Sequence, residues 1–201
     1  MIMNKDLNSP YELEELQGMG FIQIGENVKV DRTCVFYGTP NIALESNIRV
    51  DAYCVFSAGE AGIKIGSFVH IATGVSILGS GGVTIEDFVG LSARVSVFSS
   101  NDDYTGGSMT NPTVPERYRN VRSAQVIFRR HAVVGCGSVI LPGVELGVGA
   151  SIGALTLVNK SIPPFTVVSG NPMRKIGMRG RRLLEYESQL RTALGTKTNN
   201  T

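Results

Sequence analysis

A hydrophobic residue returns at every sixth position along most of this chain. With jumps of eight or nine residues and one long gap, the series comprises Ile24, Val30, Phe36, Leu44, Val50, Phe56, Ile65, Ile71, Ile77, Ile85, Leu91, Val97, Phe128, Val134, Ile140, Leu146, Ile152 and Val158. An α-helix would return every 3.6 residues, and a half-buried strand every second residue. A short strand and a turn, repeated every six residues, give instead a three-sided solenoid with about eighteen residues per coil. The period therefore predicts an all-β chain of stacked coils.

A second set of inward positions lies four residues after most members of the series. It holds mostly small side chains: Val28, Cys34, Ile48, Cys54, Val69, Val75, Val89, Val95, Ala132, Ser138, Val144, Ala150 and Thr156. Together the two sets predict about six coils, at residues 24–41, 44–64, 65–84, 85–101, 128–145 and 146–163. Because Cys34 and Cys54 occupy such positions, we expect them to pack inside the solenoid rather than to react.

The composition agrees with a narrow aliphatic core and argues against several classes of protein. Glycine supplies 24 of the 201 residues, aromatic residues only 7%, and tryptophan none, which suits short buried strands joined by tight turns. The net charge of +2 is too small for a nucleic-acid-binding protein. Three widely spaced cysteines fit neither a disulfide framework nor a zinc site. Without a membrane-spanning run or an apolar N-terminal signal, we expect no membrane insertion and a cytoplasmic location.

Two helices and one long insertion accompany the repeat. Residues 10–18 and 180–194 carry helix signals, the second with leucines near one face. The period stops after Val97, and residues 99–127 hold enough hydrophobic side chains to favour a functional arm over a disordered loop. We therefore divide the chain into an N-terminal helical segment (1–22), a repeat domain (23–170) and a basic C-terminal tail with a helix (171–201).

Three segments carry a resemblance to a known family. They are Val134-Gly135-Cys136-Gly137-Ser138-Val139-Ile140-Leu141-Pro142-Gly143-Val144, Ile152-Gly153-Ala154 and Val168-Ser169-Gly170-Asn171-Pro172. With the repeat, they make residues 20–180 resemble the hexapeptide-repeat acyltransferases, above all the sugar O-acetyltransferases (galactoside and maltose type) and the surface-polysaccharide acetyltransferases. The resemblance implies a left-handed parallel β-helix and a homotrimer whose inserted loop reaches across the subunit interface. It also implies acetyl-CoA as co-substrate and no metal.

On the donor side, the resemblance assigns small residues to the pantetheine arm and basic residues to the phosphates of CoA. The matching positions are Cys136, Ala154, Asn159, Lys160 and Arg174, and the neighbouring small and basic residues Gly153 and Lys175 complete the candidate set. One further family arginine falls on Gly177, so that contact is either absent or supplied by Lys175 or Arg179. Corner packing explains Gly153 and Ala154 equally well, and a solvated C-terminal surface would explain the basic residues.

On the acceptor side, the sequence departs from the family pattern. The family's general base is a histidine, and its position falls on Asp102, between Asn101 and Asp103. A carboxylate is a weak base unless burial or a neighbouring carboxylate raises its pKa. These residues could instead position a cationic amine, or simply form an Asx turn that opens the loop. Of the two histidines, His70 is a candidate base or a corner residue, and His131 is expected at the surface.

The missing histidine favours an amine acceptor, because a neutral amine needs less help from a base than a hydroxyl does. We therefore expect an acetyl-CoA-dependent acetyltransferase acting on a nucleotide-linked amino sugar or polysaccharide precursor in surface-polysaccharide biosynthesis. Two other interpretations remain open: O-acetylation of a free sugar or glycoside, with His70 as base, and a catalytically silent β-helix that acts as a binding module. A carbonic anhydrase-like solenoid is disfavoured because such a site needs three histidine ligands for each zinc.

Overall fold

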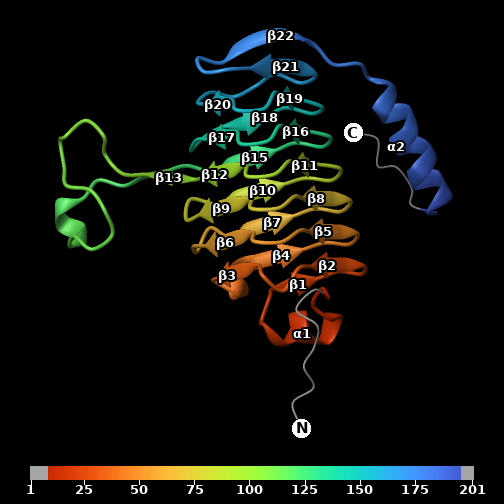
Figure 1. Cartoon of the computed structure of the whole chain (residues 1–201), viewed down its shortest axis with the longest axis horizontal. Coiled ribbons are helices and arrows are strands. Elements are labelled where there is room, and N and C mark those ends of the chain that lie inside the picture. The colour runs from red at the N-terminus through yellow and green to blue at the C-terminus, as the bar shows by residue number, and fades with distance from the viewer. Residues whose placement is uncertain (1–8, 196–201) are drawn as a thin grey trace.

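The computed structural model describes residues 9–195, and its strands stack in three parallel sheets that form the faces of a prism (Figure 1). Face 1 consists of β1 (Gln23–Ile24), β4 (Ile42–Leu44), β7 (Ile63–Ile65), β10 (Val83–Ile85), β15 (Val126–Phe128) and β18 (Glu145–Leu146). Face 2 consists of β2 (Val28–Val30), β5 (Ile48–Val50), β8 (Val69–Ile71), β11 (Gly90–Leu91), β16 (Val133–Val134), β19 (Ser151–Ile152), β21 (Thr166–Ser169) and β22 (Arg174–Met178). Face 3 consists of β3 (Val35–Tyr37), β6 (Val55–Ala58), β9 (Ser76–Gly79), β12 (Ser96–Phe98), β17 (Val139–Ile140) and β20 (Leu157–Val158).

The core is the set of residues that the six-residue period predicts. Every member of the main series is buried except Ile24 and Phe36, which are partly buried in the first coil. The small-residue set is buried throughout. The parallel register places equivalent positions directly above one another, as in Ile65, Ile85 and Phe128 on face 1. The prediction of six coils is confirmed, and β21 begins a partial seventh.

Both ends of the solenoid are covered. The helix α1 (Leu13–Gly18) lies below the first coil and buries Leu16 completely. At the other end β22 pairs antiparallel with β21 and leads into α2 (Arg182–Ala193). Both helices were predicted from the sequence. None of the helices within residues 9–195 is long and hydrophobic enough to cross a membrane.

The helix α2 docks beside the solenoid through charged side chains rather than leucines. Glu187 is the buried residue of α2. Its carboxylate lies 3.0 Å from Arg130 and 2.6 Å from Nε2 of His131, and it accepts a hydrogen bond of 2.8 Å from Arg191. The ring of His131 also stacks on Phe88 at 4.9 Å.

One sequence expectation about this region was therefore wrong. His131 is not a surface residue, since only 10% of its side chain is exposed beneath α2. The hydrophobic residues predicted near one face of the helix do not dock it, since Tyr186 and Leu190 are exposed. The cause is the corner of the prism, where Arg130, His131 and Asp87 offer charged partners that a leucine face could not satisfy.

The insertion predicted from the break in the period is an arm that leaves the fourth coil and returns to the fifth. Its stem pairs β13 (Ser100–Asn101) with β14 (Arg122–Ser123) in antiparallel fashion. A short 3₁₀ helix (Glu116–Tyr118) lies in the part farther from the solenoid. Figure 1 shows that the arm extends well away from the coils. Tyr104, Met109 and Tyr118 are half or more exposed on it, so these hydrophobic side chains of the arm stay largely uncovered within one chain.

Candidate functional site

Small residues line the corner between faces 2 and 3 in the last coils. Gly135 donates a backbone hydrogen bond to Ile152 at 2.8 Å, and Gly153 donates one to Val168 at 2.8 Å, so the two glycines lie in one column along the solenoid axis. A Cβ on Gly135 would lie 2.4 Å from the backbone nitrogen of Ala154, and one on Gly153 would lie 2.5 Å from Oγ of Ser169. The close stacking of neighbouring coils is therefore enough to require glycine at both positions, without any role in binding a donor. Cys136 and Ala154 lie beside them, partly and largely exposed, and the exposed side chain of Leu155 projects from the same turn.

The basic residues predicted for the donor lie near the C-terminal end of the solenoid. Asn159 and Lys160 follow β20, and Arg174 and Lys175 belong to β22; all four are exposed. Arg179, the alternative phosphate contact, is already engaged. It donates to the backbone oxygens of His131 at 2.7 Å and Gly149 at 3.3 Å, and burial lowers its pKa. Of the two substitutes for the missing family arginine, only Lys175 remains available.

The base of the arm holds the acceptor-side candidates in one hollow of about 440 Å³. Its lining residues are Asn101, Asp102, Asp103, Tyr104, Thr105, Arg122, Ala124, Leu141, Pro142 and Asn159. The structure therefore brings Asn101, Asp102 and Asp103 together with Asn159, which the sequence assigned to the donor side. A carboxylate pair, an arginine and two amides at one hollow can hold a polar, hydrogen-bonding ligand.

The two aspartates in this hollow have different environments. Asp103 is buried, and its carboxylate accepts hydrogen bonds from the hydroxyl and amide of Thr105 at 2.6 and 2.8 Å and from the hydroxyl of Ser108 at 3.1 Å. These bonds hold the pKa of Asp103 below its ordinary value. The expectation that adjacent carboxylates raise each other's pKa is therefore wrong for Asp103, which forms the Asx turn considered as the alternative.

Asp102 keeps more of its bonding capacity. One carboxylate oxygen accepts a long hydrogen bond of 3.2 Å from the backbone of Asn111, and the side chain is only partly buried. Because Asp103 is committed to the turn, Asp102 is the carboxylate that can meet a ligand in the hollow.

His70 lies on another face of the prism. It occupies the middle of β8 and points outward between inward Val69 and Ile71, not at a corner as expected. Its Nε2 atom lies 2.8 Å from Oδ2 of Asp51, whose other oxygen accepts a 2.7 Å hydrogen bond from Nε of Arg49. Burial would raise the pKa of Asp51, but these two partners outweigh it and lower that pKa.

Sequence reasoning missed Asp51 and Arg49 as neighbours of His70. The register pairs Arg49 with His70 across adjacent strands, 21 positions apart rather than the 18 of a regular coil, because a bulging turn separates them. Counting residues along the second coil, including its bulge between Phe56 and Ile65, would have found the pair. Among residues 9–195, no group of three histidine, cysteine or carboxylate side chains is arranged to hold a metal ion.

Within one chain, the residues predicted for the site therefore lie in several separate places. The small-residue corner, the hollow at the arm base and His70 lie on different parts of the prism surface, and Lys160, Arg174 and Lys175 lie near its C-terminal end. Only Asn159 links a donor-side prediction to the acceptor-side residues.

Comparisons with known proteins agree with this architecture. No family model matches the chain. A dTDP-4-amino-4,6-dideoxy-D-glucose acyltransferase of Escherichia coli is 47% identical over 174 residues, which is 87% of this chain and 91% of that protein. The N-acyltransferase AntD of Bacillus cereus, solved with dTDP and 3-hydroxybutyryl-CoA, is 33% identical with a TM-score of 0.90 over 94% of this chain and all of that one. Other AntD structures hold dTDP-4-amino-4,6-dideoxyglucose and coenzyme A.

A more distant neighbour shares the fold alone. Galactoside acetyltransferase in complex with coenzyme A is 24% identical, with a TM-score of 0.53 over 88% of this chain and 77% of that one. The left-handed β-helix that the resemblance implied is confirmed by these similarities. The chain belongs to the family of hexapeptide-repeat, left-handed β-helix acyltransferases that includes the Escherichia coli enzyme and AntD.

Proposed function

We propose that this protein transfers an acyl group from acyl-CoA to the amine of a nucleotide-linked amino sugar during surface-polysaccharide biosynthesis. The observation that carries the proposal is the absence of a histidine from the hollow at the arm base, where Asp102 stands instead. The names of the two similar enzymes, one of which was solved with a dTDP-linked amino sugar and CoA, support the same substrate pair. Acetyl-CoA is the expected donor.

The chemistry is a direct transfer. The amine nitrogen attacks the thioester carbonyl carbon, the new C–N bond forms, the C–S bond breaks and CoA leaves as its thiolate, which takes up the proton that the amine loses. A carboxylate with a pKa near 4 is a poor base for a hydroxyl, but it attracts a substrate ammonium and, once that ammonium has lost a proton to solvent, orients the neutral amine that attacks. We assign this role to Asp102, with Asn101 as a hydrogen-bonding neighbour and Asp103 as the residue that shapes the turn beneath them.

The donor would lie along the small-residue corner. Gly153, Ala154 and Cys136 leave room for a narrow pantetheine arm, and Asn159, Lys160, Arg174 and Lys175 supply polar and cationic contacts for its nucleotide end. Cys136 lines this path and does not act as a nucleophile. The three cysteines are free, which suits the reducing cytoplasm where we place the reaction.

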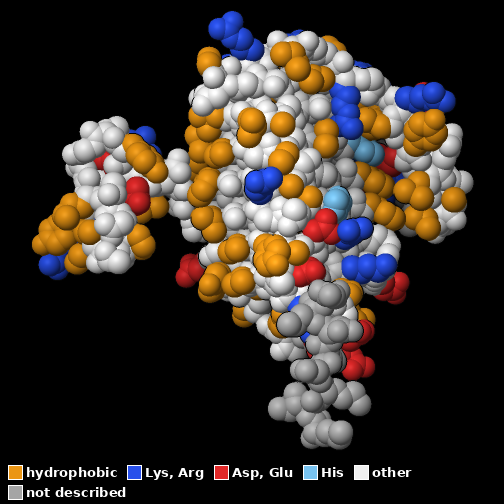
Figure 2. Space-filling model, viewed as in Figure 1, with side chains coloured by type: hydrophobic (Ala, Val, Ile, Leu, Met, Phe, Trp, Pro, Cys, Tyr) orange, Lys and Arg blue, Asp and Glu red, His pale blue; other side chains and the backbone are white. Residues whose placement is uncertain are grey.

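We further propose that the active enzyme is a homotrimer. Within one chain the arm has exposed hydrophobic side chains, and face 3 exposes Val35, Tyr37 and Leu78 on its outer side. Figure 2 shows hydrophobic side chains along the edge of the solenoid nearest the arm and on the arm itself. A second copy would cover these surfaces and bring its small-residue corner to the arm's hollow. Sedimentation equilibrium should give three times the chain mass of 21.5 kDa.

A thiol-release assay tests the proposed reaction. Acetyl-CoA and 3-hydroxybutyryl-CoA are offered with a dTDP-linked 4-amino sugar, the matching 4-hydroxyl sugar and free galactosides. We expect CoA release with the amino sugar and little with the others. Release with the hydroxyl acceptors alone would overturn the proposal, and no binding of acyl-CoA by calorimetry would favour the silent binding module.

One observation favours a second candidate, O-acetylation. His70 is held by Asp51 at 2.8 Å, the arrangement by which a carboxylate orients an imidazole base for a hydroxyl. The hydroxyl acceptors in the same assay test this candidate. If it is correct, His70→Gln abolishes their acylation while Asp102→Asn leaves it unchanged.

A further inference from the structure

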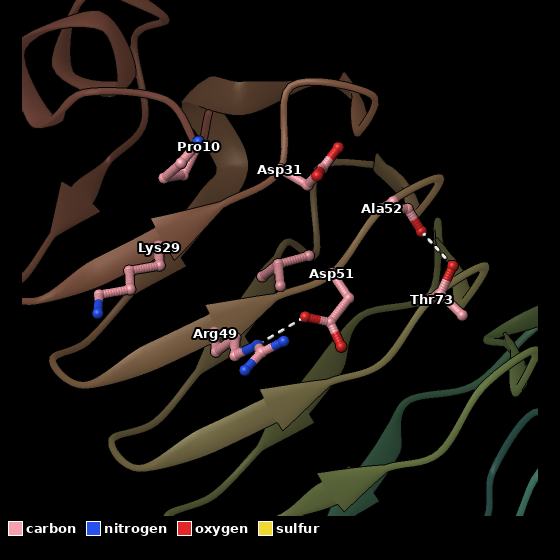
Figure 3. A pocket seen from close by; sticks show the side chains of 8 residues that line it. Pro10, Lys29, Asp31, Arg49, Asp51, Ala52 and Thr73 are labelled. Atoms are coloured by element: carbon pink, nitrogen blue, oxygen red, sulfur yellow. Dashed lines mark hydrogen bonds and ion pairs between the residues drawn. The ribbon is translucent and has the colours of Figure 1, made fainter. Parts of the chain in front are cut away.

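A second hollow lies at the N-terminal end of the solenoid, lined by residues of the first three coils and Pro10 (Figure 3). Its volume is about 520 Å³, and its lining residues are Pro10, Lys29, Asp31, Arg49, Val50, Asp51, Ala52 and Thr73. We call it the N-terminal pocket. Lys29 on β2 and Arg49 on β5 are directly paired in the register of face 2. Their two cationic side chains therefore lie on neighbouring strands at one wall of the pocket, as Figure 3 shows.

These cations keep free hydrogen-bond donors. Arg49 uses Nε to reach Asp51 at 2.7 Å, and its two terminal nitrogens make no hydrogen bond within residues 9–195. Lys29 makes no ion pair in the same part of the chain. The carboxylate of Asp31 accepts hydrogen bonds from the amide and hydroxyl of Thr33 at 2.9 and 2.6 Å. The acidic side chains are thus largely occupied, while the basic ones can still bind an anion.

The pocket belongs to the same corner as the proposed donor path. A ladder of backbone hydrogen bonds joins successive coils along that corner, from Asp31 to Val50, Asp51 to Ile71, Ala72 to Leu91, Ser92 to Val134, Gly135 to Ile152 and Gly153 to Val168. Asp51 and Gly135 are three coils apart in this column, which corresponds to about 14 Å at the usual strand spacing. A molecule in the N-terminal pocket can therefore extend along the corner toward the donor.

The distribution of charge along this corner suits a reaction between two substrates that each carry a diphosphate. Acyl-CoA and a nucleotide sugar each carry a diphosphate, and two such groups repel each other. Basic residues occur at both ends of the corner: Lys29 and Arg49 at one, and Arg174 and Lys175 near the other. The arm leaves from the fourth coil, between the two ends. If the amine of the nucleotide sugar and the thioester of acyl-CoA meet at the level of the fourth coil, the diphosphates of the two substrates stay far apart.

We infer that the N-terminal pocket binds the diphosphate of the nucleotide-sugar acceptor, with Lys29 and the terminal nitrogens of Arg49 contacting its phosphate oxygens. The inference rests on the proposed function, since it assigns the acceptor's charged part to a place in the same groove. The sugar then extends along the corner toward Ala72 and Ser92, where, in the proposed trimer, the amine meets the thioester and Asp102 of the partner subunit.

Calorimetric titration tests the assignment without acyl transfer. The probes are dTDP, inorganic pyrophosphate and CoA, each titrated into the wild-type protein and into the double variant Lys29→Ala/Arg49→Ala. The matched control is Lys64→Ala, an exposed lysine on the outward side of face 1. We expect the double variant to weaken dTDP and pyrophosphate binding on the order of 10–100-fold, with CoA affinity unchanged and Lys64→Ala behaving as wild type.

Lys29→Gln, which leaves the Arg49–Asp51–His70 contacts intact, serves as a second variant if removal of Arg49 lowers the thermal stability. Unchanged dTDP affinity in folded variants would overturn the assignment. Loss of CoA affinity with dTDP binding retained would also overturn it and give the pocket to the donor. If dTDP binds through Lys29 and Arg49 but no amino sugar is acylated, the proposed function fails while the site stands. If the variants acylate the amino sugar normally and keep the wild-type affinity for dTDP, the proposed function stands and the assignment of the pocket fails.

Discussion

The adjacent aspartates at the base of the arm illustrate how neighbouring identical residues acquire different roles. Asp103 accepts three hydrogen bonds from Thr105 and Ser108, so its carboxylate is committed to the turn. Asp102 accepts one long bond from Asn111 and lines the hollow with bonding capacity to spare. The sequence predicted both residues for the site but could not separate them, because an Asx turn and a ligand site use the same residue types.

Replacing Asp102 by asparagine tests its assignment. Asp102→Asn keeps the shape and the acceptor for the Asn111 amide but removes the charge that orients a substrate ammonium. We expect kcat/KM for the amino sugar to fall on the order of 100-fold, with the affinity for CoA unchanged. Steady-state kinetics measures the first and calorimetry the second. A variant with wild-type kcat/KM would remove Asp102 from the mechanism.

At the scale of the strand, the alternation of inward and outward residues determines what a coil contributes to stability. Ile65 is buried, and Lys64, the residue before it on β7, points outward and is exposed. We expect Ile65→Ala to lower the free energy of unfolding by about 3 kcal/mol and Lys64→Ala to lower it by less than about 1 kcal/mol. Denaturant unfolding of the two variants provides the comparison. Equal losses would contradict the assignment of the six-residue period to the core.

At the scale of the helix, α2 depends on one buried carboxylate. Burial would raise the pKa of Glu187, but hydrogen bonds from His131 and Arg191 outweigh it and lower that pKa below its ordinary 4.5. A lowered pKa in the folded protein means that docking gains stability above pH 4.5 and loses it as the pH falls through the lower folded-state value. Arg130 and Asp87 belong to the same network, Asp87 through its ion pair with Arg191.

Glu187→Gln should therefore release α2 while leaving the coils folded. We expect the amide protons of α2 to exchange faster by a factor that corresponds to about 2 kcal/mol, and acidification to have the same effect on the wild-type helix. Glu185→Gln, an exposed glutamate on the same helix, is the matched control. If the amide protons of α2 exchanged at the same rate in both variants, the Glu187 network would not be what holds the helix against the coils.

The elements also show how far the sequence can lead. The coils, the two helices and the arm were predictable because a period of six and its interruption are local patterns. The docking of α2 was not, because His131 and Glu187 lie 56 residues apart in the chain and only the corner of the prism brings them together. The Arg49–Asp51–His70 cluster was missed for the same reason: bulges of variable length between coils determine which outward residues become neighbours.

At the scale of the whole molecule, the proposed homotrimer would share its groove between subunits. The arm hollow with Asp102 and the small-residue corner with Ala154 lie on different parts of one chain, so each would complete the other only across an interface. Such a trimer would cover the exposed tyrosines of the arm, which leaves the solenoid at its middle coils.

Mixing two inactive variants tests this sharing. Asp102→Asn disables the arm, and Ala154→Trp, at an exposed corner position, blocks the donor path. Unfolded and refolded together in equal amounts, they should regain about a quarter of wild-type activity, since in a random cyclic trimer about one site in four takes both intact halves. Each variant refolded alone should stay inactive. A mixture as inactive as its components would place the whole site within one chain.

The mass of the reaction product tests the central claim most directly. After incubation with acetyl-CoA and dTDP-4-amino-4,6-dideoxyglucose, the nucleotide sugar should gain one acetyl group in step with CoA release. That group should resist hydroxylamine, as an amide does and an ester does not. A nucleotide sugar of unchanged mass, or one whose acetyl group hydroxylamine removes, would contradict the transfer to nitrogen proposed for this protein.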